Sequence, residues 1–266
     1  MNSSGPFQSL SELTVDELIC VALESSDLEE PSRATAALVA LHERGSREVL
    51  VAAIELCNSR ELPKRILGAR ILGELGGPGV HRGFPDECCD TLLRLAASDE
   101  NMEVVIAAVF ALGHLGNRRS DEALSDFSNH PHPLVRKGVA FALNGATSQR
   151  AVKALLVLME DPDAEIRDWA TTGIGMTVLI DGPEIRAALM RRSQDKDEFT
   201  RAEALHGLVR RRDNRVVPLL AKEIEKLSER TYLFEDAAKD WLGLDSQQHF
   251  DTGELITKLR SCEAFF

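Results

Sequence analysis

A segment of about ten residues recurs along this chain at intervals of 31 to 34 positions, and at 40 positions across one insertion. The copy that begins at Asp161 reads Asp-Pro-Asp-Ala-Glu-Ile-Arg-Asp-Trp-Ala, and the other copies resemble it in the turn, the arginine and the apolar positions. The copies begin at or near Asp27, Ser59, Asp99, His130, Asp161 and Asp195. A fixed period of this length is the signature of a repeat architecture, in which each unit buries its apolar face against its neighbours.

Each copy predicts a helix, a short turn and a second helix. In the fourth copy one apolar stripe has helical spacing, formed by Val135, Val139, Ala142 and Leu143. A second stripe follows between Ser148 and Glu160, formed by Val152, Leu155, Leu156 and Met159. Prolines stand near the predicted helix starts, where a missing N–H costs little. The unit is therefore a helical hairpin.

We expect an all-α fold, an α-α superhelix (HEAT-like solenoid) of about six helical hairpins with N- and C-terminal capping helices. Aromatic residues make up only 5% of the chain, which favours closely packed helices built from Leu, Ala, Val and Ile. Thr14-x-x-Glu17 is a capping-box pattern that predicts a helix over residues 14–25. The expected organisation is a capping segment over 1–26, six repeats over 27–227 and capping helices over 228–266.

The formal net charge of −12 disfavours nucleic acid and anionic membranes as partners, because both present phosphate. A local basic cluster is the exception, and it either forms a basic patch or lies on a solvated face opposite carboxylates. It comprises Arg191, Arg192, Arg210, Arg211, Arg212 and Arg215. No secretory signal or membrane-spanning run is visible, and five scattered cysteines suit free thiols. We expect a cytoplasmic protein.

Ten residues, Gly76 to Pro85, interrupt the second copy between its helices. Inserted loops in repeat arrays often serve binding, so this segment is either a functional loop or a drifted surface loop.

No catalytic motif is present in the sequence. The chain lacks a phosphate-binding G-x-x-x-x-G-K-[ST] loop, H-E-x-x-H, C-x-x-C and G-x-S-x-G. His114, His130 and His132 fit polar turn positions better than a surface metal site, and Cys88-Cys89 point about 100° apart in a helix. We expect no enzyme, no cofactor and no metal site.

The units Arg136-x-x-Val139-Ala-Phe-Ala-Leu143 and Asp161-x-Asp-x-Glu-Ile-Arg167 resemble bacterial HEAT-like repeats of the phycobilin-lyase type. The resemblance covers about residues 27–227. It implies a ladder in which the arginine at the head of each first helix pairs with a turn aspartate of a neighbouring repeat. The matching arginines are Arg65, Arg136, Arg167 and Arg201. Val105 breaks the ladder in the third copy, and His130 replaces the turn aspartate in the fourth.

The resemblance does not fix a function, because the repeat is a packing unit. The family includes bilin lyase subunits, phycobilisome-degradation factors, iron hydroxylases and bacterial adaptors. The hydroxylases need several His-Glu dipeptides as iron ligands, and this chain has only His42-Glu43. The related DNA glycosylases need a basic concave face, which the net charge argues against.

The most unusual surface positions fall in copies four to six. Trp169 stands where other copies hold smaller or charged residues, and it either binds a partner or packs between repeats as core. Large aromatic residues flanked by charges are common in interaction hot spots. The candidate partner-binding residues are Arg136, Phe141, Asp168, Trp169, Thr172, Arg201, Glu203 and His206.

Three hypotheses follow. The first is a non-catalytic scaffold or adaptor that binds a protein along one face of the repeat array. The second is an acidic inhibitor or immunity protein that neutralises a basic partner, because complementary charge speeds association. The third is a bilin lyase-like subunit, as the resemblance implies.

Overall fold

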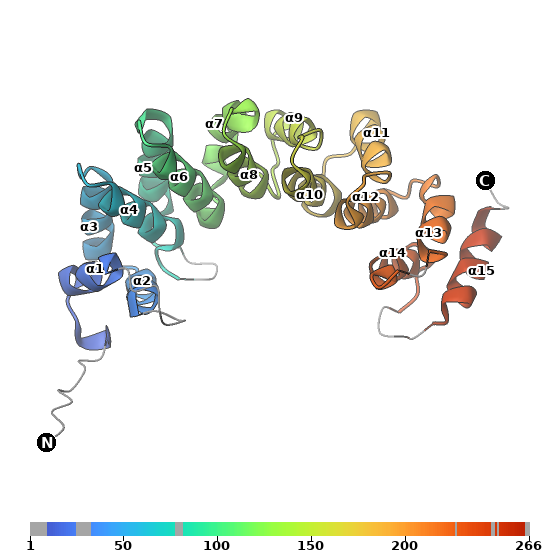
Figure 1. The fold of residues 1–266 in the computed structure, drawn as a ribbon, viewed down its shortest axis with the longest axis horizontal. Helices are drawn as coiled ribbons and strands as arrows, with labels where there is room; N and C mark the ends of the chain where they lie inside the picture. Colours follow the sequence, from blue (N-terminus) through green and yellow to red (C-terminus); the bar gives the residue numbers. More distant parts are fainter. Residues whose placement is uncertain are drawn as a thin grey trace, which may run out of the picture. The chain divides into compact units, whose positions relative to one another are not determined.

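The structure, a computed structural model, describes residues 10–24, 33–77, 82–226, 228–245, 248 and 250–263. In these residues every regular element is a helix, which confirms the predicted all-α class. The chain divides into two compact units, Met1–Ala123 and Leu124–Phe266 (Figure 1). The division falls inside the short helix α7, and the repeat pattern alone does not predict it.

The first unit holds the N-terminal helix and the first three repeats. Its helical pairs are α2 with α3, α4 with α5, and α6 with the short helices that follow it. The bounds are η1 Leu10–Glu12, α1 Val15–Leu23, α2 Arg33–Arg44, α3 Arg47–Cys57, α4 Leu62–Glu74, α5 Pro85–Ser98, α6 Met102–Leu115, η2 Arg118–Ser120 and α7 Asp121–Ser125. Helix α4 packs against α6, so the first helices of successive pairs are neighbours.

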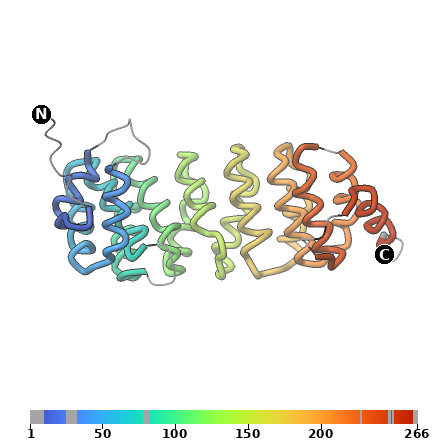
Figure 2. Tube along the Cα trace, turned by 90° about the horizontal axis from the view of Figure 1, so that it is seen from below, coloured from blue at the N-terminus to red at the C-terminus, as the bar shows by residue number. Residues whose placement is uncertain are grey.

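The second unit holds the last three repeats and two closing helices. The bounds are η3 Asp126–Asn129, α8 Pro133–Ala142, α9 Gln149–Leu158, α10 Ala164–Thr172, the π-helical turn η4 Gly173–Thr177, α11 Pro183–Arg192, α12 Glu198–Arg210, α13 Val216–Ile224, α14 Thr231–Leu242 and α15 Thr252–Glu263. The first helices α8, α10, α12 and α14 pack in sequence, and Figure 2 shows them side by side. In the described residues this gives the predicted six pairs with capping helices at both ends.

The predicted helix signals are confirmed in detail. Thr14 Oγ1 accepts a hydrogen bond from the Glu17 backbone N–H, and the Glu17 carboxylate accepts one from the Thr14 N–H at 2.7 Å. This capping box begins α1. The first stripe of the fourth copy, from Val135 to Leu143, is fully buried. The looser first copy and the inserted segment are only partly visible, since residues 25–32 and 78–81 lie outside the described residues.

The arginine ladder is present and joins neighbouring repeats within each unit. Arg65 donates to both carboxylate oxygens of Asp99 at 2.7 and 3.3 Å, and its other guanidinium nitrogen donates to the carbonyls of Ser59 and Arg60. In the second unit Arg136 pairs with Asp161 and Arg167 pairs with Asp195 in the same way. Bidentate arginine–carboxylate pairs of this kind are strong and geometrically specific.

The ladder departs from the resemblance at two places. Arg201 reaches Glu223 of helix α13 at 3.3 Å, instead of a turn aspartate. In the sequence, Val105 and His130 stand where the pattern of the other rungs has an arginine and an aspartate.

Candidate functional site

The predicted partner-binding residues all lie in the second unit, on the first helices α8, α10 and α12. Two of them have a structural task. The guanidinium groups of Arg136 and Arg201 are part of the ladder and also donate to backbone carbonyls of their own turns. The remaining six residues are called the acidic–aromatic patch below: Phe141, Asp168, Trp169, Thr172, Glu203 and His206.

An aromatic pair joins α8 to α10. The rings of Phe141 and Trp169 meet edge to face, with centroids 5.4 Å apart and planes at 88°. Both side chains are only half-buried. Edge-to-face pairs are a favoured arrangement of aromatic rings, worth about 0.5–1.5 kcal/mol beyond the burial of apolar area. Trp169 therefore packs between repeats while part of its surface stays exposed.

Two carboxylates, called the carboxylate pair below, lie on the adjacent helices α10 and α12. Asp168 Oδ1 and Glu203 Oε2 are buried and accept no hydrogen bond from any described residue. Burial raises the pKa of Asp168 to about 6, and the nearby carboxylates of Asp197, Glu165 and Asp195 add to the shift. Burial also raises the pKa of Glu203, with a contribution from the charge of Asp168. The structure thus holds two mutually repelling carboxylates in a half-buried site without a cation.

Two glycines let the helix that carries Glu203 approach the turn after α10. A Cβ atom on Gly207 would lie 2.7 Å from the Gly175 Cα atom, and one on Gly175 would lie 2.8 Å from the Glu203 carbonyl oxygen. The π-helical turn after α10 can therefore approach α12 only because both positions lack a side chain. This close approach places the Glu203 backbone against the π-helical turn.

A buried arginine fixes the same turn. The Arg211 side chain is 7% exposed and its guanidinium donates to the carbonyls of Ile174, Gly175, Val178, Ile180 and Gly207. It ties the end of the π-helical turn to α12. The sequence analysis placed Arg211 in a basic cluster and did not predict this buried role. Gly175 and Gly207 were the one indication in the sequence that the two segments approach closely here.

Much of the predicted basic cluster is paired with carboxylates. Arg191 and Arg192 both contact Glu160, and Arg215 contacts Asp213 at 2.6 Å. The alternative of a solvated face with carboxylates opposite describes Arg191 and Arg215, whereas the Arg192 side chain is only 16% exposed. Arg212 instead lies over the Trp241 ring at 5.7 Å and donates to the Trp241 carbonyl.

The two remaining patch residues lie beside the acidic pair along the same helices. The His206 Nε2 atom is 3.2 Å from the Leu233 carbonyl oxygen, which ties α12 to α14. Thr172 is half-buried at the end of α10. The patch is therefore continuous over three packed helices.

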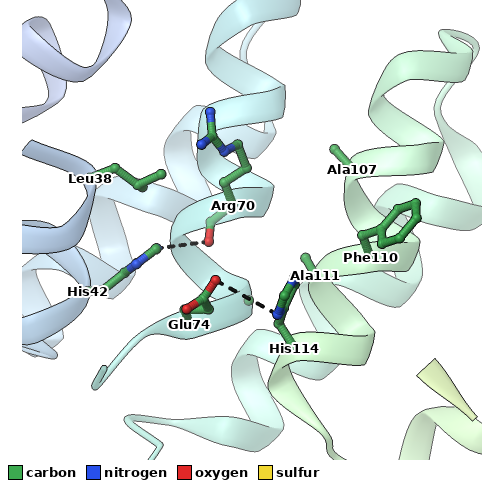
Figure 3. A pocket seen from close by; sticks show the side chains of 9 residues that line it. Leu38, His42, Arg70, Glu74, Ala107, Phe110, Ala111 and His114 are labelled. Atoms are coloured by element: carbon green, nitrogen blue, oxygen red, sulfur yellow. Dashed lines mark hydrogen bonds and ion pairs between the residues drawn. The ribbon is translucent and has the colours of Figure 1, made fainter. Parts of the chain in front are cut away.

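The first unit contains a hollow that sequence reasoning did not predict. It has a volume of about 330 Å³ and is walled by α2, α4 and α6 (Figure 3). Its lining residues are Leu38, His42, Arg70, Gly73, Glu74, Ala107, Phe110, Ala111 and His114. A signal was available, because Arg70 and Phe110 occupy the repeat position of Phe141, Thr172 and His206.

In the described part of the chain, no group of three or more His, Cys, Asp or Glu residues could hold a metal ion. Burial raises the pKa of Cys57 and of Cys88 to about 12, so neither thiol forms a reactive thiolate near neutral pH. Over the same residues, no helix combines the length and the apolarity that crossing a bilayer requires.

Comparison with known sequences identifies the repeat. The sequence model of HEAT repeats matches three overlapping stretches, residues 54–144, 89–175 and 152–229, which together cover more than half of the chain. The chain belongs to the HEAT-repeat family. This confirms the resemblance that the repeat units carry.

Several known HEAT-type proteins are similar over nearly the whole chain. Protein YibA of Escherichia coli strain K12 is 26% identical over 269 residues, which cover 95% of this chain and 92% of YibA. The X-ray structure of YibA matches with a TM-score of 0.70 at 24% identity, covering 95% and 93% of the two chains.

Two more distant structures share the fold. An archaeal HEAT-like repeats protein from Thermococcus onnurineus NA1 matches with a TM-score of 0.55 at 16% identity, over 93% of this chain and 98% of that one. The complex of CpcE and CpcF of phycocyanin lyase from Nostoc sp. PCC7120 matches with a TM-score of 0.50 at 19% identity, over 98% and 99%. These likenesses establish the fold of this HEAT-repeat protein. Its function has to be inferred from its own surface residues.

Proposed function

We propose that this protein is a non-catalytic scaffold or adaptor that binds a protein partner through the acidic–aromatic patch. The observation that supports the proposal is the carboxylate pair, whose oxygens Asp168 Oδ1 and Glu203 Oε2 are buried without a hydrogen-bond donor. HEAT-type repeats present extended surfaces, so a partner can contact all three helices of the patch at once.

A buried carboxylate without a partner lowers the stability of the fold. With its pKa at about 6, Asp168 is still mainly ionised at pH 7, so burial has not removed its charge. A cation brought by a partner would interact strongly with both carboxylates in this half-buried site, and it would end their mutual repulsion. The partner group that fits is a lysine ammonium or an arginine guanidinium.

The aromatic pair supports the same reading. Trp169 follows Asp168 directly, and its half-buried ring offers apolar surface beside the carboxylates. Cations interact favourably with the face of a tryptophan ring, and tryptophan is enriched at the centres of protein interfaces. The patch therefore combines the two features that recognise a basic side chain.

A second candidate function is that of an acidic inhibitor or immunity protein that neutralises a basic partner. The same carboxylate pair favours it, together with the net charge of −12. Complementary charge accelerates the association of such pairs. It differs from the scaffold in that the partner loses an activity when it is bound.

The bilin lyase alternative rests on fold alone. The likeness to the phycocyanin lyase complex is at 19% identity, and none of the patch residues supplies a bilin-specific group. An absorbance titration with a bilin tests this alternative directly.

The scaffold proposal is tested by site-specific photo-crosslinking in cells. A benzophenone amino acid at Thr172 should capture a partner, and the same group at Leu179, an exposed residue outside the patch, should not. Mass spectrometry then identifies the partner. Equal capture from both positions would contradict the proposal.

The purified partner is then measured against a matched pair of variants. Asp168→Asn with Glu203→Gln should weaken binding by at least about tenfold, because each change removes a charge that the partner neutralises. Glu184→Gln, an exposed carboxylate on α11, should leave the affinity unchanged. Loss of the partner's own activity on binding would favour the inhibitor over the scaffold. Unchanged affinity of the double variant would rule out the patch as the binding site.

A further inference from the structure

The hollow in the first unit differs in chemistry from the acidic–aromatic patch. Its volume of about 330 Å³ is at the lower end of the range that small ligands occupy. Much of the wall is apolar, formed by Leu38 of α2 and by Ala107, Phe110 and Ala111 of α6. Figure 3 shows Arg70, His42, Glu74 and His114 around this wall.

The hollow owes its size to a close helix contact. A Cβ atom on Gly73 would lie 2.9 Å from both the Cα and the Cβ atom of Ala111, so α4 and α6 touch at this point. Small residues at the contact and at Ala107 leave space that larger side chains would fill. The hollow therefore results from small residues on α4 and α6, namely Gly73, Ala107 and Ala111.

Three of the polar groups around the hollow already have partners. The His42 Nε2 atom lies 3.1 Å from the Arg70 carbonyl oxygen, and burial lowers the pKa of His42, which keeps its ring neutral near pH 7. The Glu74 carboxylate lies 3.9 Å from the His114 ring. Nearby, the Arg82 guanidinium donates to the carbonyls of Gly77 and His114.

The Arg70 guanidinium is the exception. It is exposed, and no hydrogen bond or ion pair joins it to a described residue. In Figure 3 it extends from α4 between Leu38 of α2 and Ala107 of α6. An unpaired cation beside an apolar hollow selects a ligand that is apolar and carries a negative charge.

We infer that this hollow binds the C-terminal residue of a partner polypeptide. A C-terminal Leu or Phe carries an apolar side chain and a free carboxylate on the same residue, whereas an internal Asp or Glu lacks the apolar body. The side chain would enter the hollow between Leu38 and Phe110, and the carboxylate would pair with Arg70. Capture of a chain terminus is a known mode of peptide recognition. The inference concerns the other unit and a ligand of opposite charge, so it does not depend on the proposed function.

The test is an NMR titration of the full ¹⁵N-labelled chain, since a single residue is expected to bind weakly. The probe is the acetylated tripeptide Gly-Gly-Leu with a free carboxylate, compared with the same tripeptide as its C-terminal amide. Saturable shifts should centre on amides of α4 and α6, including Gly73. The amide should bind about tenfold more weakly, the loss expected for one charged hydrogen-bonded contact.

Two variants locate the carboxylate. Arg70→Met should reduce the affinity for the free-acid peptide about tenfold, to that of the amide, without changing the affinity for the amide. Arg60→Met, which removes an exposed arginine of the same unit outside the hollow, should leave both affinities unchanged. A third variant, Ala107→Met, narrows the hollow and should weaken both peptides.

Several results would overturn the inference: equal binding of acid and amide, unchanged affinity of Arg70→Met, or shifts that centre elsewhere in the chain. If 4-methylpentanoate, which has the side chain and the carboxylate but no peptide group, binds more tightly than the tripeptide, the occupant is a small carboxylic acid and the chain terminus is rejected. Because Arg70, Ala107 and the expected shifts all lie in the first unit, these results do not test the acidic–aromatic patch.

Discussion

The two units build surfaces of opposite charge on the same helical repeat. In the second unit the first helices present two uncompensated carboxylates beside an aromatic pair. In the first unit the equivalent helices leave a hollow with an unpaired arginine, while the nearby Glu74 lies beside His114. The repeat position that holds Arg70 in α4 holds Phe141 in α8 and Thr172 in α10.

Some features occur in both units, and others differ between them. Both units contain the ladder, with Arg65–Asp99 in the first and Arg167–Asp195 in the second. Both also contain a close helix contact at a small residue, Gly73 in the first and Gly207 in the second. The ladder and the contacts set the packing, and the positions between them differ in charge and size between the two units.

The largest effects should come from the ladder, and they should be larger in the first unit. Asp99 is 7% exposed and Arg65 is its one cationic partner among the described residues, so Arg65→Met leaves a buried carboxylate unpaired and should cost about 3–5 kcal/mol of unfolding free energy. Asp195 keeps Arg192 at 2.9 Å when Arg167 is replaced, so Arg167→Met should cost about 1–3 kcal/mol in the second unit. Both tryptophans, Trp169 and Trp241, belong to the second unit, so their fluorescence reports urea unfolding of that unit alone.

The probes make the ladder prediction specific. Arg167→Met should move the fluorescence transition, whereas Arg65→Met should move only the far-ultraviolet circular dichroism transition. The surface pair Arg47–Glu87 serves as the control, because its side chains are 62% and 46% exposed. Arg47→Met should cost less than about 1 kcal/mol. A fluorescence shift in Arg65→Met equal to that in Arg167→Met would show that the two units unfold together.

A smaller effect is expected at the glycine contact of the second unit. Gly207→Ala places a Cβ atom 2.7 Å from the Gly175 Cα atom, so α12 must move away from the π-helical turn. The strain should cost about 1–3 kcal/mol. The same movement should hydrate Glu203 and Asp168 and lower their raised pKa values toward the ordinary range. NMR titration of the carboxyl carbons measures both pKa values, and unchanged values would mean that this contact does not cause the burial.

The fold was predictable from the sequence because its determinants are local or periodic. The stripe from Val135 to Leu143 and the capping box at Thr14 need only helical spacing to be recognised. The ladder arginines could be assigned because Arg65, Arg136, Arg167 and Arg201 occupy the same position in four copies of the repeat. The site was only partly predictable: the repeat register brings Asp168, Trp169 and Glu203 onto adjacent first helices, which the structure shows packed together.

The rest of the site depends on distances that no periodic pattern contains. The close approach of α12 to the turn after α10 depends on Gly175 and Gly207, and that turn is a local departure from the regular helix. Arg211 lies in a run of three arginines that reads as solvent-exposed, yet its guanidinium is buried among carbonyl groups. The hollow in the first unit likewise arises from small residues on two helices, and it becomes visible only when α4 and α6 are placed together.

The acidic pair should show a stability effect of opposite sign. Asp168→Asn removes a buried charge without a partner, so the variant should be more stable than the natural chain by about 1–2 kcal/mol at pH 7. The gain should depend on pH. Since the pKa of Asp168 rises from 3.8 to about 6 on folding, the folded state binds the proton more tightly than the unfolded state. As the pH rises from about 4 to about 6, the natural chain therefore loses stability relative to Asp168→Asn. The difference in unfolding free energy between the two proteins grows over that range and is constant above it.

Urea unfolding followed by tryptophan fluorescence at several pH values measures this difference, and comparison with the variant cancels the titration of all other groups. Glu184→Gln is the control and should change neither stability nor its pH dependence, because Glu184 is exposed on α11. A destabilised Asp168→Asn would mean that the carboxylate has a stabilising partner in the free protein. The carboxylates of the acidic–aromatic patch would then already be compensated, which contradicts the proposed binding of a partner's cation.

The smallest effect should come from a contact in the first unit, where Glu74 lies 3.9 Å from the His114 ring. Both side chains are well exposed, so His114→Gln should change the unfolding free energy by less than about 0.5 kcal/mol. Its effect on binding should be larger in proportion, because it removes the ring that lies between the Glu74 carboxylate and the hollow's ligand. The tripeptide carboxylate should then bind about two- to threefold more weakly. The C-terminal amide should bind His114→Gln and the natural protein equally. If the variant weakens the acid and the amide alike, His114 acts by shaping the hollow, and the charge contrast between the two units rests on Arg70 alone.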